Sequence, residues 1–107
     1  MLAVGKLGAE VSQEAGIEAA RLCALNVLAQ LDAAVGDLDH GVAQCVRLGG
    51  FINAVPSFSA LAGIMNGASD LMVELLGDRG RHARSTIGVA ELPLDAAVEV
   101  EAMFEVR

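Results

Sequence analysis

The clearest pattern in the chain is a helical one over residues 12–35, which are rich in Ala and Leu and contain no Pro. Ser12 precedes this segment as a candidate N-cap, and Glu14 adds a negative charge to the first turn. Polar side chains form one narrow stripe, and apolar side chains cover most of the remaining surface. The pattern predicts a helix from Ser12 to Val35 with one side in water and the other against a sheet.

An alternating pattern follows from Val42 to Val55, where Pro56 ends it, and this alternation predicts a strand. The polar residues 36–41 before it have the composition of a turn. Inside the strand, the pair Gly49-Gly50 indicates a bulge or a close backbone approach.

A second helical period lies in the middle of the chain, with apolar residues at the i, i+3, i+4, i+7 and i+8 positions of one face. It predicts a helix that begins near Asn66 as its cap and stops at Gly77. The residues of this apolar face are Ala68, Leu71, Met72, Leu75 and Leu76.

Further segments have the character of strands. Residues 1–7 alternate weakly, as at the end of a strand, and residues 85–91 and 97–106 read as two strands around a turn. In the last segment, small or apolar residues alternate mainly with glutamates, so the two kinds point to opposite faces. The order predicts one α+β domain over residues 1–107, with two helices on one face of a sheet.

Composition adds an expectation about assembly. Apolar residues make up 54% of the 107 residues, whereas aromatic residues make up 3%, so the core must be aliphatic. A domain of this size buries only about two thirds of the surface that its unfolded chain exposes. We therefore expect some apolar surface to be covered by another copy of the chain.

Charge narrows the choice of partners. The net charge is −7, from 14 acidic and 7 basic residues, which disfavours binding to a nucleic-acid backbone. The apolar stretches are interrupted before they reach the length of a bilayer, and residues 1–8 lack the layout of a signal peptide. We expect a soluble cytoplasmic protein that binds neither nucleic acid nor membrane.

Arg84 and Glu99 are the pair of residues with the most evident chemistry, because neighbouring strands would let them share one pocket. A guanidinium binds a carboxylate ligand through a planar fork, and a carboxylate can take a proton from water. The alternative is that Glu99 belongs to the solvated face of its strand and that Arg84 neutralises a glutamate across the sheet. The residues alone favour this second interpretation.

The histidines and cysteines indicate no metal site. His40 lies in a polar turn and His82 follows Arg81, so both read as surface residues. Cys23 and Cys45 have neither CxxC spacing nor flanking His ligands, and they read as buried, reduced thiols. The glycines lack the spacing of a phosphate-binding loop. We expect neither a metal nor a nucleotide cofactor.

Longer motifs change the interpretation of Arg84 and Glu99. Residues 83–93, ARSTIGVAELP, and residues 98–102, VEVEA, resemble the C-terminal signature of the YjgF/Rid family of reactive-intermediate imine deaminases, also called L-PSP endoribonuclease-like. Residues 47–53, 66–74 and 19–26 extend the resemblance over nearly the whole chain and look like one branch of this family.

The resemblance implies a chorismate-mutase-like two-layer α+β sandwich that assembles as a homotrimer, with ligand pockets at the subunit interfaces. It further implies that Arg84 binds the carboxylate of a 2-imino acid and that Glu99 positions the water that attacks the C=N carbon. Ser85 and Thr86 would line the substrate site. The products are a 2-keto acid and ammonia, and no metal or organic cofactor is required.

The chain also departs from the family pattern. Thr86 occupies a position where many members have Cys, and members open with a further strand and turn that help to close the pocket, whereas residues 1–8 resemble only their second strand. An alternative function is therefore a non-catalytic trimer that binds small carboxylates such as 2-keto acids. Ribonuclease activity, suggested by the older family name, conflicts with the net charge of −7 and ranks last.

Overall fold

The computed structural model describes residues 3–107, which form an α+β fold of two layers, as expected. One layer consists of helices, and the other is a three-stranded sheet. The elements in chain order are α1 (Gln13–Val35), α2 (Leu38–Gly41), β1 (Val42–Asn53), α3 (Leu61–Leu76), the 3-10 turn η1 (Gly77–Gly80), β2 (Ala83–Val89), the 3-10 turn η2 (Pro93–Asp95) and β3 (Val98–Val106).

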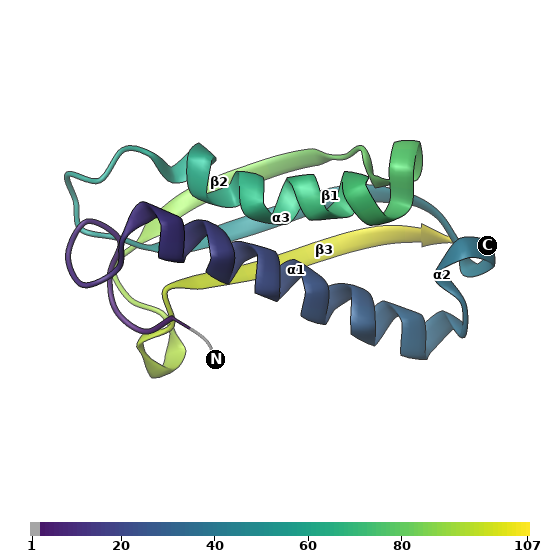
Figure 1. Ribbon diagram of the computed structural model, residues 1–107, viewed down its shortest axis with the longest axis horizontal. Coiled ribbons are helices and arrows are strands. Elements are labelled where there is room, and N and C mark those ends of the chain that lie inside the picture. Colours follow the sequence, from purple (N-terminus) through teal and green to yellow (C-terminus); the bar gives the residue numbers. More distant parts are fainter. Residues whose placement is uncertain (1–2) are drawn as a thin grey trace.

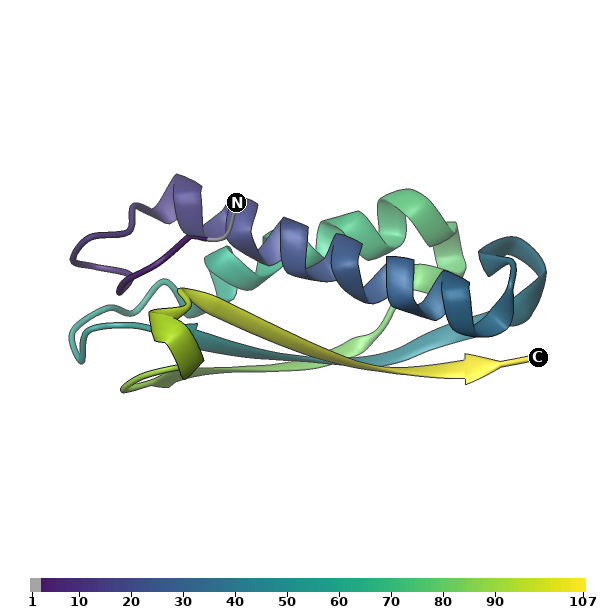
Figure 2. The same cartoon turned by 90° about the horizontal axis from the view of Figure 1, so that it is seen from below.

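The sheet is mixed, with strand order β2-β1-β3. The central strand β1 is parallel to β2 and antiparallel to β3. Figures 1 and 2 show α1 and α3 side by side over one face of this sheet, and within residues 3–107 no helix covers the opposite face. The prediction of two helices on one sheet face is confirmed, and one sheet face stays open in the single chain.

The prediction for α1 is confirmed at both ends. The Ser12 side chain accepts a hydrogen bond from the backbone N–H of Ala15 at 3.1 Å, which satisfies one of the donors that a helix start leaves unpaired. At the other end, Gly36 adopts a left-handed φ of 83° and its N–H donates to the carbonyl of Asp32.

Helix α3 begins at Leu61, so the predicted start near Asn66 is wrong. Asn66 lies exposed in the middle of the helix, and Ala60 precedes the helix without a side-chain cap. The reason lies in packing, because Ile64 and Met65 are fully buried and extend the apolar face one turn toward the N-terminus. The predicted stop is correct, since Gly77 follows the last residue with a positive φ of 63°.

The strand expected over residues 1–7 is not seen in its described part. There, Val4 and Leu7 make isolated bridges instead of a continuous ladder. Gly5 adopts a left-handed φ of 113°, which interrupts an extended backbone. Residues 1–2 lie outside the described part of the chain.

Residues 36–41, expected to be a turn, contain the single helical turn α2. The Asp37 side chain caps it by accepting from the backbone N–H of Asp39 at 2.9 Å. Short polar residues favour both turns and helix caps, so the composition alone did not separate these two structures.

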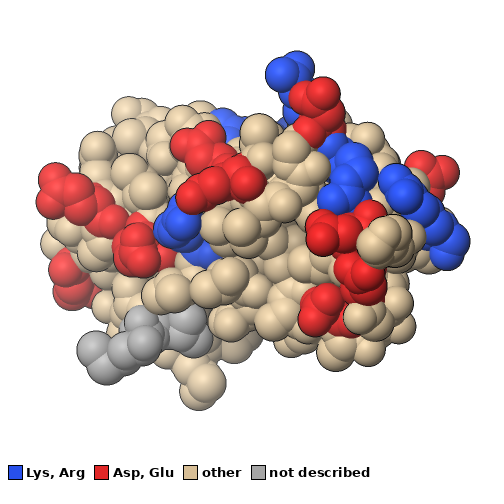
Figure 3. Space-filling view, turned by 45° about the vertical axis from the view of Figure 1, so that its right-hand side comes forward, with Lys and Arg blue, Asp and Glu red and all other residues tan. Residues whose placement is uncertain are grey.

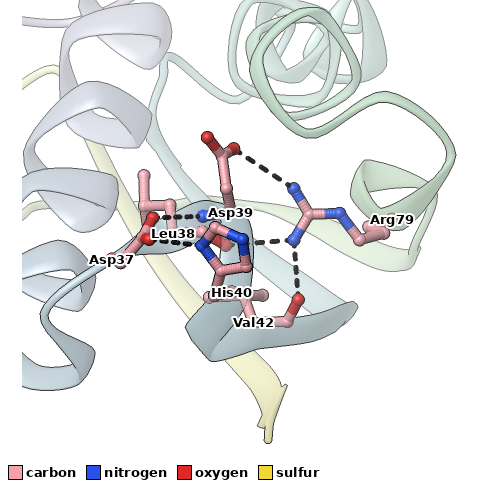
Figure 4. Close-up of polar contacts among 6 residues, drawn as sticks. All are labelled: Asp37, Leu38, Asp39, His40, Val42 and Arg79. Carbon is pink, nitrogen blue, oxygen red and sulfur yellow. Dashed lines mark hydrogen bonds and ion pairs between the residues drawn. The ribbon is translucent and has the colours of Figure 1, made fainter.

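Arg79 of η1 links α2 to the start of β1 through hydrogen bonds and an ion pair, as Figure 4 shows. Its Nη1 atom donates to the carbonyls of Leu38 and Val42, at 3.0 and 2.6 Å. The other terminal nitrogen, Nη2, lies 3.8 Å from Oδ1 of Asp39. The charged side chain thus satisfies two backbone carbonyls, those of the first residue of α2 and the first residue of β1.

At the pair Gly49-Gly50 the described part of the chain shows neither the expected bulge nor a close backbone approach. The register of β1 against β3 shifts nearer the start of β1, between residues 42 and 47, so no bulge lies at the glycine pair. A side chain approaches instead of another backbone segment, because a Cβ on Gly50 would lie 2.5 Å from the Sδ atom of Met65. Glycine lets α3 sit close to the centre of the sheet.

The core is aliphatic as expected, and among the described residues the buried polar side chain is Asn53. Its Nδ2 donates to the carbonyls of Gly5 and Ala96, at 3.2 and 3.1 Å. Its Oδ1 accepts from Lys6 Nζ at 2.7 Å. These bonds tie the N-terminal segment and the η2 turn to the end of β1. None of the helices within residues 3–107 has the length and apolar character to cross a membrane.

Candidate functional site

A hollow of about 330 Å³ lies between α3 and the start of β2. The residues around it combine hydroxyl, imidazole, guanidinium and carboxylate groups, and they are Ser69, Asp70, Val73, Arg81, His82 and Arg84. Several of these groups are hydrogen-bonded to one another, which makes this hollow the candidate site.

Ser69 lies at the centre of these hydrogen bonds. Its Oγ accepts from Arg84 Nη1 at 3.0 Å and lies 2.8 Å from Nε2 of His82. The other ring nitrogen of His82, Nδ1, is 2.5 Å from the carbonyl oxygen of Gly80. Arg84 is held a second time, because its Nη2 donates to the carbonyl of Ala62 at 3.2 Å. A continuous chain of polar contacts therefore runs from the η1 turn to β2 through α3.

The local sequence explains how this contact forms. Ser69 is four residues after the buried Met65 and three before the buried Met72, so it lies at the border of the buried face of α3. Gly80 is buried against the same helix, and a Cβ there would lie 2.1 Å from the carbonyl oxygen of Met72. Only glycine permits this approach, which carries His82 to the side of Ser69.

The predicted site residues divide between the two faces of the sheet. Arg84 pairs in register with Leu48, a core residue, so Arg84 points toward the helices, and Thr86 two residues later does the same. Ser85 lies between them and points to the open face. Glu99 alternates with the inward-facing valines of β3 and also projects from the open side.

The expectation that Arg84 and Glu99 occupy neighbouring strands is wrong for a single chain. Their strands, β2 and β3, are the two outer strands, and β1 runs between them. Glu99 lines a different hollow of about 330 Å³ at the outer side of β3, together with Cys23, Asn26 and Gln30 of α1. One chain therefore does not bring the guanidinium and this carboxylate into one pocket.

Thr86 carries an unused polar group. Its Oγ1 is buried and has no hydrogen-bond partner among residues 3–107. A buried hydroxyl without a partner is costly, but its oxygen is closed to solvent and Thr86 does not line the hollow, so a ligand reaches it only after a neighbouring side chain moves. It lies on the same side of β2 as Arg84.

Two residues of the hollow were not recognised from the sequence. His82 was expected at the surface, but it is half-buried and hydrogen-bonded at both ring nitrogens. Ser69 is 13 residues from His82 in sequence, a spacing that belongs to no local motif. The helical period does place Ser69 beside an apolar face, and this is the one signal that could have found it.

The remaining candidates show no catalytic arrangement. Cys23 and Cys45 are free thiols, as expected, but only Cys45 is buried, whereas Cys23 is half-buried. Burial raises the pKa of Cys45 to about 11, and burial together with the charge of Glu99 raises the pKa of Cys23. His40 is exposed, and its hydrogen bond to Asp37 raises its pKa. Within residues 3–107 no group of three or more His, Cys, Asp or Glu side chains could hold a metal ion.

The charged surface gives no sign of a nucleic-acid interface on the face that Figure 3 shows. Basic side chains there lie beside acidic ones and form no broad positive area. Arg21 is 3.0 Å from Glu74, and Arg81 is 3.4 Å from Asp78, so several cations are already paired. Local ion pairing and the net charge of −7 both disfavour binding to a nucleic-acid backbone.

Comparison with known proteins places the whole chain within one family. A family model described as "YjgF/chorismate mutase-like, putative endoribonuclease" matches residues 1–106. Protein TCP17 of Trypanosoma cruzi is 50% identical over 104 residues. The match covers 96% of this chain but 64% of that protein, so the chain spans less than two thirds of the length of this curated relative.

Solved structures agree in fold. The protein Atu1372 of Agrobacterium tumefaciens, described as having unknown function, superposes with a TM-score of 0.95 at 42% identity, covering 98% of this chain and 66% of that one. A "putative endoribonuclease" from Shewanella oneidensis superposes with a TM-score of 0.91 at 36% identity, covering 95% and 67% of the two chains. This chain therefore shares its two-layer arrangement with the matched part of these longer proteins.

Proposed function

The chain belongs to the YjgF/chorismate mutase-like endoribonuclease family, and from this membership we propose that it hydrolyses reactive 2-imino and enamine acids to 2-keto acids and ammonia. The observation that carries the proposal is the state of Arg84, a half-buried guanidinium at a hollow of about 330 Å³. Such a group recognises the carboxylate that every 2-imino acid carries.

Arg84 keeps binding capacity after its own contacts are counted. A guanidinium has five N–H donors, and within residues 3–107 Arg84 uses one toward Ser69 and one toward Ala62. The donors that remain can form a bidentate pair with a carboxylate. The two internal bonds also fix the guanidinium, which lowers the entropy lost when a ligand binds. Thr86 adds a hydroxyl on the same side of β2.

Glu99 is assigned the role of positioning the attacking water, and the geometry requires a second copy of the chain for this. Within one chain it lines another hollow, and Ser85 points to the open face rather than toward Arg84. We propose that Glu99 and Ser85 of a neighbouring copy complete the site, so that pockets lie at the interfaces of a homotrimer. No metal or organic cofactor takes part in this proposal.

The open sheet face supports assembly. It carries apolar side chains on all strands, including Phe51 of β1, and Ile87 and Met103 on the outer strands are 50% and 60% exposed. Large apolar side chains left exposed together often mark a contact surface, so this face is suited to contact with other copies. Its glutamates, among them Glu99 and Glu101, need solvent or cationic partners there.

The ribonuclease function in the relatives' descriptions is the less favoured candidate. Binding of an RNA backbone requires a positive surface, and the chain has a net charge of −7. A trimer that binds small carboxylates without turnover is the closer rival, because it needs Arg84 but not Glu99. The experiment below separates these functions.

The test is the release of ammonia from 2-iminopropionate, generated in place by a dehydratase that acts on serine. The parent chain is expected to accelerate release, and Arg84→Ala to lower kcat/KM about 100-fold, because a charged two-bond fork contributes about 3 kcal/mol. Arg21→Ala is the control, since Arg21 lies exposed on α1 and pairs with Glu74. Ammonia release at the uncatalysed rate would contradict the proposal.

Two further arms identify the rivals. Pyruvate that raises the melting temperature of the parent but not of Arg84→Ala, without ammonia release, would indicate the binding protein. Cleavage of a labelled RNA by the parent, lost in Arg84→Ala, would indicate the ribonuclease.

A further inference from the structure

We infer that Ser69 and His82 form a proton relay that serves the hydrolytic step at Arg84, an inference that rests on the imine hydrolase proposed above. The observation behind it is the unbroken contact from Gly80 through His82 and Ser69 to Arg84, beside a hollow that three of these side chains line.

The contacts of His82 assign its tautomer. The carbonyl oxygen of Gly80, 2.5 Å from Nδ1, can only accept, so Nδ1 carries the proton. In the neutral imidazole, Nε2 then has a free lone pair, and it lies 2.8 Å from Ser69 Oγ. The hydroxyl of Ser69 therefore donates to His82. This is the arrangement of a general base next to a hydroxyl, with the base oriented by a third group.

Ser69 retains one position for a reactant. A hydroxyl has one donor and two lone pairs, and here the donor serves His82 while one lone pair accepts from Arg84 at 3.0 Å. The second lone pair has no partner among residues 3–107, and Ser69 lines the hollow. A water in the hollow can donate a proton to this lone pair. The nearby Arg84 guanidinium, a fixed positive charge, favours the electron-rich state of the oxygen.

The location decides between this pair and Glu99 as the proton-transfer group. Within one chain, Ser69 and His82 lie beside Arg84 at the first hollow, whereas Glu99 lines another hollow. Glu99 of a neighbouring copy keeps its proposed role of positioning the water, and the Ser69–His82 pair carries the proton. Asp70 also lines the first hollow, but it is exposed and forms no hydrogen bond with Ser69 or His82 within the described chain. The charged groups around His82 are thus Arg81, Arg84 and Asp70.

The relay balances protons over the reaction. Water attacks the imine carbon, and the electron pair of the C=N bond moves to nitrogen. The water proton passes to Ser69 Oγ as the Ser69 proton passes to His82 Nε2, and the imidazolium returns a proton through Ser69 to nitrogen. The C–N bond of the carbinolamine then breaks. The proton of the carbinolamine hydroxyl passes through Ser69 and His82 to the leaving nitrogen, which departs as ammonia. The 2-keto acid remains, and both side chains regain their initial state.

Kinetics of Ser69→Ala and His82→Gln test the relay. Each substitution removes the proton path, so kcat is expected to fall about 100-fold, the effect of losing general acid–base catalysis. His82→Gln leaves both hydrogen bonds of Arg84 in place, so its KM is expected to stay within about twofold of the parent value. Ser69→Ala removes one of these two bonds and is expected to raise KM as well. The matched controls are Ser57→Ala and His40→Gln, since both of these residues are exposed and neither lines the hollow. Circular dichroism at the assay temperature verifies that each variant is folded.

The pH profile distinguishes a relay from a merely structural contact. Protonation of Nε2 stops it accepting from Ser69, so kcat of the parent falls as the pH is lowered, and this acid limb disappears in His82→Gln. An unchanged acid limb in His82→Gln would overturn the relay.

The remaining outcomes are also decisive. Parent kcat in Ser69→Ala and His82→Gln would overturn the relay while leaving the proposed hydrolase standing. A parent chain without imine hydrolysis would overturn both. Nitrogen-15 NMR of His82 in the folded chain is an independent check, because a proton on Nε2 instead of Nδ1 would contradict the relay whatever the kinetics.

Discussion

At the residue scale, Arg79 and Arg81 show how little the type of a side chain decides. They are two residues apart, yet Arg79 donates to the carbonyls of Leu38 and Val42, whereas Arg81 pairs with Asp78 at 3.4 Å in solvent. The side chains are 24% and 77% exposed, respectively. Hydrogen bonds from a charged donor to buried carbonyls stabilise a fold, and exposed ion pairs contribute little.

This contrast gives a prediction for stability. Arg79→Ala leaves two backbone carbonyls without their donor, and it is expected to lower the free energy of unfolding by about 2 kcal/mol. Arg81→Ala is the control and is expected to change it by less than about 0.5 kcal/mol. Urea unfolding followed by circular dichroism measures both. Equal effects of the two substitutions would show that the contacts in Figure 4 do not stabilise the chain.

At the scale of elements, the backbones of α1 and α3 approach each other closely at Gly67 of α3. A Cβ on Gly67 would lie 2.2 Å from the carbonyl oxygen of Ile17, which is backbone and cannot rotate away. Gly63 lies one turn earlier in the same helix, and a Cβ there would meet no atom within 4 Å. Two glycines of one helix thus have opposite roles, since only Gly67 marks a contact between helices.

Alanine substitutions at Gly67 and Gly63 should change the stability of the chain in opposite directions. Gly67→Ala pushes α1 away from α3 and is expected to destabilise the chain by about 2 kcal/mol or more. Gly63→Ala fills open space and reduces the entropy of the unfolded chain, so it is expected to stabilise by about 0.5–1 kcal/mol. Thermal unfolding of both variants gives the comparison. Stabilisation by Gly67→Ala would contradict the close approach of α1 and α3 at Gly67.

At the scale of the whole molecule, the layers leave one sheet face uncovered. Helices protect one face in Figure 2, and the other face exposes apolar residues of β2 and β3. The separation of Arg84 from Glu99 leads to the same conclusion, because a site containing both needs a second chain. Assembly and activity are therefore expected to be lost together.

Substitution on the open face tests this expectation. Ile87→Lys introduces a charge into the proposed interface and is expected to convert a trimer, of three times 11.0 kDa, into monomers. Leu75→Lys on α3 is the matched control, because Leu75 and Ile87 are both 50% exposed but Leu75 lies outside the open sheet face. Light scattering coupled to size-exclusion chromatography measures the mass. A parent chain of monomeric mass, or a trimer that survives Ile87→Lys, would contradict an interface on this face.

The sequence by itself determined the features that depend on neighbouring residues. Periodicity and capping located α1, the alternation of valines and glutamates located β3, and Gly77 marked the end of α3. These signals are local, because a cap, a period or a left-handed glycine acts within one or two turns. The family was also evident from the sequence, since its motifs lie within short segments of the chain.

The tertiary structure alone decided the features that depend on which segments meet. The start of α3 followed from burial of Ile64 and Met65, not from a cap at Asn66. Strand order placed β1 between the strands of Arg84 and Glu99, and a local pattern cannot specify the order of strands in a sheet. The contact of Ser69 with His82 arises because Gly80 lets the chain pass against α3, a contact between surfaces that no periodicity encodes.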